Sequence, residues 1–109
     1  VTVITDSPDV LADAEGACGM IHDAIKAGLG KPDQYITVAL QEAKCVTVGK
    51  QKVAVAIYIH SIGGNLKAPL KEICEGLEEK YKVSRQQVVA TFAESTVSTF
   101  GMNGAPLSG

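Results

Sequence analysis

Nucleophilic and metal-binding side chains are few in this sequence. The three cysteines and two histidines form no C-x-x-C pair and no spacing typical of a zinc site. Cys18 and Cys74 each fall in an apolar helical stripe, which predicts core side chains and not reactive thiols. His60 lacks a Ser/His/Asp constellation, so we interpret it as structural, and we expect His22 to lie in solvent. The sequence therefore predicts no metal site and no cofactor.

Among the basic residues, Lys31 is the one whose position indicates a role, because it follows Gly30 at the end of an apolar helical stripe. Its simplest role there is to complement the helix dipole. Residues 28–31 superficially resemble a phosphate-binding loop, but Pro32 stands where such loops have Ser or Thr, which argues against nucleotide binding. With 10 basic and 12 acidic residues, the chain also lacks the charge of a general nucleic-acid binder.

The element that organises the chain is an apolar run at residues 53–64, which predicts a central strand covered on both faces. Its β-branched side chains alternate onto a face suited to helices, made of Val53, Val55, Ile57 and Ile59. The other face carries Ala54, Ala56, Tyr58 and His60. That second face would stay bare in a monomer, so we expect association to cover it.

Periodicity predicts the other elements. We expect strands at 1–5, 35–40, 46–48 and 88–92, helices at 12–29 and 68–82, and a brief strand with a tight turn at 100–104. Strand, helix and strand thus occur twice, with Val1 matching Val53 and Ile36 matching Val88 (53 − 1 = 52, 88 − 36 = 52).

This pattern predicts one α/β domain at 1–109, made of two pseudo-symmetric halves at about 1–52 and 53–104. In each half a β-α-β unit would contribute two strands to a four-stranded mixed sheet. Right-handed crossovers would then place both helices on one face of that sheet.

Three stretches, 30–36, 60–64 and 101–104, resemble in order and spacing the macrophage migration inhibitory factor and D-dopachrome tautomerase family of the tautomerase superfamily. The match spans nearly the whole chain. The resemblance implies a homotrimer whose sheets surround a central channel, with pockets at the subunit interfaces.

In that family an N-terminal proline acts as the general base in keto-enol tautomerisation of keto acids such as phenylpyruvate. Val1 stands in its place here. By resemblance, the α-amine of Val1 would be the base, Lys31 would bind the substrate carboxylate or carbonyl, and the backbone N–H of Ile62 would donate to it. An α-amino group has an ordinary pKa of about 7.7–8, which burial lowers, so it can act near neutral pH.

The resemblance also implies which residues contact the substrate. They are Ser61, Val89, Thr91, Phe100 and Met102, together with Tyr35, which would come from the neighbouring subunit. Several aromatic or polar positions of the family differ here, namely Val89, Thr91, Met102 and Leu107. The family's C-A-x-C redox motif falls at residues 54–57, which hold no cysteine, so thiol oxidoreductase chemistry is not expected.

Two alternatives remain open for Val1. Either a proline precedes it in the native protein and the proline chemistry applies, or Val1 is the mature terminus. In the second case its primary amine acts as a base or forms a Schiff base with carbonyl compounds.

The predicted function is a MIF-like homotrimer with weak or altered phenylpyruvate- or dopachrome-type tautomerase activity, which makes it an isomerase. The alternative is a non-catalytic, cytokine-like member that binds other proteins. Expected partners are further copies of the chain, a small keto acid or aromatic carbonyl compound and a protein receptor, with no nucleic acid and no membrane. Since no signal peptide and no 18-residue apolar stretch is present, we expect a cytoplasmic protein. The resemblance also allows secretion without a signal peptide.

Overall fold

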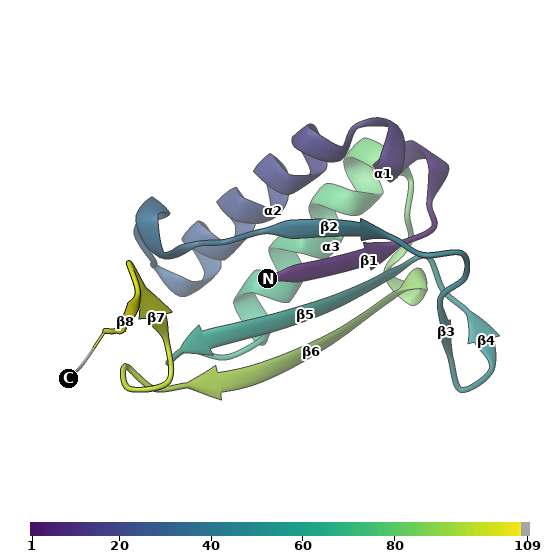
Figure 1. Ribbon diagram of the computed structural model, residues 1–109. Coiled ribbons are helices and arrows are strands. Elements are labelled where there is room, and N and C mark those ends of the chain that lie inside the picture. The colour runs from purple at the N-terminus through teal and green to yellow at the C-terminus, as the bar shows by residue number, and fades with distance from the viewer. Residues whose placement is uncertain (108–109) are drawn as a thin grey trace.

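The computed structural model describes residues 1–107 and contains one main sheet, two long helices and two small hairpins (Figure 1). The elements in chain order are β1 (Thr2–Thr5), α1 (Pro8–Ala12), α2 (Ala14–Leu29), the 3₁₀ helix η1 (Asp33–Tyr35), β2 (Ala39–Glu42), β3 (Thr47–Val48), β4 (Gln51–Lys52), β5 (Val55–Ile62), α3 (Lys67–Tyr81), the 3₁₀ helix η2 (Arg85–Gln87), β6 (Val88–Ser95), β7 (Gly101–Met102) and β8 (Ala105–Pro106). Within residues 1–107, no helix is long and apolar enough to cross a membrane.

The main sheet has the strand order β2-β1-β5-β6. β1 is parallel to β2 and antiparallel to β5, while β5 is parallel to β6. Helices α2 and α3 lie side by side on one face of this sheet (Figure 1). The predicted α/β fold, with a four-stranded mixed sheet and two helices on one face, is confirmed.

The core lies between that face and the helices. Val55, Ile57 and Ile59 of β5 are fully buried there, against Ile21 of α2 and Leu77 of α3. Alternation places Tyr58 on the opposite face, where 45% of the residue is exposed. The two predicted faces of the central strand are therefore confirmed from Val55 onward.

Val53 departs from this alternation. It packs with Val46 and Ala56 in a small cluster on the opposite side of the sheet, not with the helices as predicted. The physical reason is that the strand begins at Val55, while Val53 is held by its N–H bond to the carbonyl of Val46. A period of two applies only where the backbone is a regular strand.

The predicted strand at 35–40 is also wrong at its start. Tyr35 ends η1, in which the N–H of Tyr35 donates to Pro32 and that of Ile36 to Asp33, both at 3.1 Å. β2 consequently begins only at Ala39, where its N–H bonds the carbonyl of Val1. The β-branched and aromatic residues of this stretch favour a strand, but its first residues instead form the local hydrogen bonds of a 3₁₀ turn.

The predicted helix at 12–29 is divided at Asp13, which separates α1 from α2. The Asp13 carboxylate accepts a hydrogen bond from the Tyr81 hydroxyl at 2.8 Å, joining the start of α2 to the end of α3. Burial and this bond raise the pKa of Tyr81 to about 12. Cys18 and Cys74, predicted as core side chains, are only half-buried, because they lie at the margins of the apolar stripes.

The 52-residue offset holds for part of the chain. Gly30 and Lys82 both end their helices in the left-handed conformation, and η1 and η2 follow three residues later. The strand register differs, since Thr2 pairs with Ala39, 37 residues on, whereas Val55 pairs with Val88, 33 residues on. Val1 and Val53 therefore do not lie at equivalent places in β1 and β5, and the division into halves stays a prediction.

Candidate functional site

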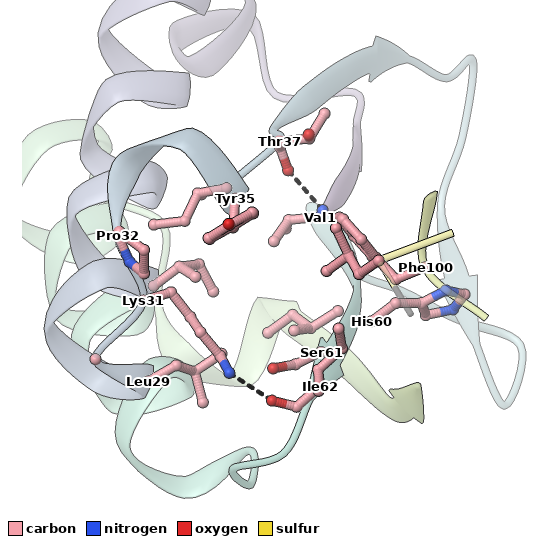
Figure 2. A pocket seen from close by; sticks show the side chains of 15 residues that line it. Val1, Leu29, Lys31, Pro32, Tyr35, Thr37, His60, Ser61, Ile62 and Phe100 are labelled. Atoms are coloured by element: carbon pink, nitrogen blue, oxygen red, sulfur yellow. Dashed lines mark hydrogen bonds between the residues drawn. The ribbon is translucent and has the colours of Figure 1, made fainter. Parts of the chain in front are cut away.

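A cavity of about 500 Å³ lies where α2 ends, next to η1 and the end of β5. Its walls are mostly aliphatic. Phe100 (Figure 2), just before the β7-β8 hairpin, and Leu107, just after it, also line the cavity. The aliphatic lining side chains include Ile25, Leu29, Ile36, Ile59 and Leu107. An apolar hollow with a few convergent polar groups is the usual form of a small-molecule site.

Lys31 is placed in this cavity by the end of α2. Gly30 adopts a φ of +66°, which a glycine accepts without a Cβ penalty, and its N–H bonds the carbonyl of Lys26 at 2.9 Å. The chain then turns away from the helix axis. The ammonium of Lys31 reaches across the cavity and donates to the carbonyl of Ile62 at 2.5 Å (Figure 2).

The far side of the cavity is the end of β5. Ser61 is buried, and its hydroxyl donates to the carbonyl of Gly63 at 2.9 Å. Gly63 and Gly64 follow with φ of +77° and +83°, so they turn the chain out of the sheet where other residues would be strained. The resemblance predicts that the N–H of Ile62 donates to a substrate, and this stays a prediction. In the structure the carbonyl of Ile62 accepts from Lys31.

The α-amine of Val1 is the second polar group in the cavity. It donates to the carbonyl of Thr37 at 2.7 Å (Figure 2). The carbonyl of Val1 in turn accepts from the N–H of Ala39. Burial lowers the pKa of this amine below 8.0. A larger share of it is therefore uncharged near neutral pH than in a solvated peptide.

The other predicted contact residues divide into two groups. Tyr35, Ser61 and Phe100 line the cavity, as do His60 and Leu107. The residues that do not line it in the single chain lie on β6 and β7 and are Val89, Thr91 and Met102. Val89 packs instead near Val46 on the sheet face opposite the helices.

A group of charged residues next to the cavity was missed from the sequence. The Asp33 carboxylate lies 2.8 Å from the His22 imidazole and 3.1 Å from the Lys26 ammonium. These two hydrogen bonds, that from His22 first, hold the pKa of Asp33 below its ordinary value. His22 was predicted to be solvated, but the spacing of four residues puts it on the same helical face as Lys26, which could have indicated a shared partner.

The cavity thus combines a cation, an amine of lowered pKa and aliphatic walls. An ammonium can bind a carboxylate or stabilise a developing oxyanion, and an uncharged amine can accept a proton from carbon. Residues 1–107 contain no cluster of three His, Cys, Asp or Glu side chains that could hold a metal. The arrangement suits proton transfer on a small carbonyl compound.

Comparison with known proteins identifies the family of this chain and the solved structures that share its fold. The family model described as macrophage migration inhibitory factor (MIF) matches residues 11–108. A MIF homologue from Prochlorococcus marinus has a TM-score of 0.80 to this structure at 20% identity, covering 98% of this chain and 97% of that one. The MIF of Toxoplasma gondii gives 0.75 at 19% identity, covering 94% and 95%. Malonate semialdehyde decarboxylase gives 0.77 at 13% identity, covering 94% and 88%. Comparison with curated protein sequences gives no match.

Proposed function

Because the chain belongs to the macrophage migration inhibitory factor family, we propose that it catalyses keto-enol tautomerisation of small carbonyl acids in the cavity beside Lys31. The observation that carries the proposal is the placement of the Lys31 ammonium and the Val1 amine in one largely aliphatic hollow. Phenylpyruvate is a suitable test substrate, because it has a carboxylate for Lys31 and an enolisable carbon next to its carbonyl.

The proposed reaction needs one base and one cation. In a chain that begins at Val1, the uncharged α-amine accepts a proton from the carbon next to the carbonyl, so that the C–H bond breaks and electron density moves to the carbonyl oxygen. The proton then passes from nitrogen to that oxygen and gives the enol. Lys31 has three N–H donors, of which one is directed at Ile62. Within residues 1–107 the other two have no partner, so they are available for the substrate oxygens.

The three substrate-contact residues outside the cavity fit the proposal if the chain forms a trimer. Val89 and Thr91 lie on β6, one of the two edge strands of the sheet, and Met102 lies on β7. Part of the sheet face opposite the helices is exposed in the single chain, beyond the small cluster around Val53, and Tyr58 lies there. We expect light scattering at micromolar concentration to give three times the chain mass, and a monomer mass would contradict this assembly.

The activity test is an ultraviolet assay of phenylpyruvate and hydroxyphenylpyruvate. We expect a rate above buffer for the chain that starts at Val1. Acetylation of the α-amine should lower kcat/KM by about 10²-fold or more, because a positioned general base contributes roughly 10²–10⁴. A matched chain with one proline added ahead of Val1 shows whether a secondary amine is the better base. Equal rates in protein and buffer for all three chains would overturn the proposal.

A further inference from the structure

The turn that carries Lys31 follows Gly30, whose backbone is the least restricted of any residue type. Pro32 has a fixed φ, so the backbone at Gly30 and the side-chain bonds of residues 31–35 set how this turn is oriented. One restraint is the bond from Lys31 to Ile62. A substrate carboxylate that binds the other two N–H groups of Lys31 pulls on the same ammonium, so this bond alone does not hold the turn.

The second restraint comes from helix α2. Asp33 accepts from His22 at 2.8 Å and from Lys26 at 3.1 Å, two side chains spaced one helical turn apart. The paired donors fix the carboxylate against a rigid element, two residues beyond Lys31 and two before Tyr35. Both Lys31 and Tyr35 line the cavity. This second restraint does not involve the substrate, so it remains when Lys31 is engaged.

We propose that His22 and Asp33 are positioning residues, which hold the turn at residues 31–35 so that Lys31 and Tyr35 keep their places while substrate is bound. The inference rests on the proposed function, because it assigns these residues to that same cavity. His22 is the better-shielded donor, with 28% of its side chain exposed against 52% for Lys26. Its removal should therefore have the larger effect.

The experiment compares His22→Ala with His22→Gln, whose side-chain amide can still donate to Asp33. We expect His22→Ala to raise KM for phenylpyruvate about two- to five-fold with a smaller change in kcat, the range that exposed pairs of this kind give. His22→Gln should restore most of the loss. Asp33→Asn should behave like His22→Ala. The control is Asp23→Asn, an exposed acid on the same helix without a side-chain hydrogen bond in residues 1–107.

A second readout does not depend on catalysis. The amides of Tyr35 and Ile36 make the η1 hydrogen bonds, and those of Gln87 and Val88 make the η2 hydrogen bonds. By NMR hydrogen exchange, His22→Ala should speed the first pair about two- to five-fold and leave the second pair unchanged. Unchanged exchange at Tyr35 and Ile36, or an unchanged KM in the active protein, would overturn the inference. If the unmodified chain shows no tautomerase activity, the proposed function fails and hydrogen exchange alone decides on the restraint.

Discussion

The turns after the two long helices share their backbone but not their surroundings. Each helix ends on a left-handed residue, Gly30 after α2 and Lys82 after α3, and each leads into a 3₁₀ helix and then toward a strand. After α2, Lys31 points into the cavity and Asp33 is tied back to the helix. After α3, the turn is closed by its own capping box, between Ser84 and Gln87.

This difference shows that local backbone structure does not make a site. Both turns form hydrogen bonds within themselves, yet the cavity that contains Lys31 lies at the first turn. The end of β5 lies opposite the first turn, so the Ile62 carbonyl and the lysine face each other there. The site depends on which element ends opposite the turn.

Removal of the Lys31 charge should have the largest effect. We expect Lys31→Met to lower kcat/KM for phenylpyruvate about 10²-fold, as the loss of one donor to a developing oxyanion typically does. Lys82→Gly removes a lysine from the matching turn and should leave the rate unchanged. Steady-state ultraviolet kinetics on both variants checks this, and equal losses in the two would show that net charge, not the first turn, matters.

A substitution where α2 lies against α3, just before the first turn, should have the next largest effect. A Cβ at Gly28 would lie 2.6 Å from the backbone nitrogen of Pro69, so Gly28→Ala must push the helices apart. We expect a loss of about 1–3 kcal/mol in the free energy of unfolding, measured by urea denaturation. Gly19→Ala, in the same helix with open space around the new methyl group, should instead stabilise by about 0.5–1 kcal/mol. Two variants of equal stability would contradict the close approach.

Removing glycine from one helix cap and introducing it at the other should change the free energy of unfolding in opposite directions. Gly30→Ala places a Cβ on a residue with φ of +66° and should cost about 1 kcal/mol, since its surroundings are otherwise open. Lys82→Gly relieves a φ of +57° and should stabilise by about 0.5 kcal/mol. Urea denaturation of both variants measures this, and stability changes of the same sign would show that the caps are not equivalent.

The smallest predicted effect concerns pH. The His22 hydrogen bond, followed by that of Lys26, holds the pKa of Asp33 below 3.8. A depressed carboxyl pKa contributes stability above the ordinary value, and that contribution is lost as the pH falls through the lowered value. Carboxyl-carbon NMR titration should show that His22→Ala raises the pKa of Asp33 toward 3.8, and Lys26→Ala raises it less. An unmoved titration midpoint in both variants would exclude the pairing.

Much of the fold follows from periodicity, and less of the site does. The buried face of β5 and both long helices appear in the sequence as regular patterns, whereas strands β4 and β8 of the two hairpins were not predicted. Tyr35 was misplaced in a strand because local turn hydrogen bonds override its strand propensity. The contact of Asp33 with His22 joins side chains from two elements, so no local pattern encodes it. The resemblance supplied Lys31, whose residue type alone indicated only a helix-end charge.

The central claim is that small carbonyl acids bind at the first turn and not at the second. Amide NMR during a titration with phenylpyruvate tests it most directly. The account predicts saturable shift changes at Lys31, Tyr35 and Ser61 to Gly63, with residues 84–87 unmoved. Saturable changes elsewhere that leave the first turn unmoved, or no saturable change at all, would contradict it.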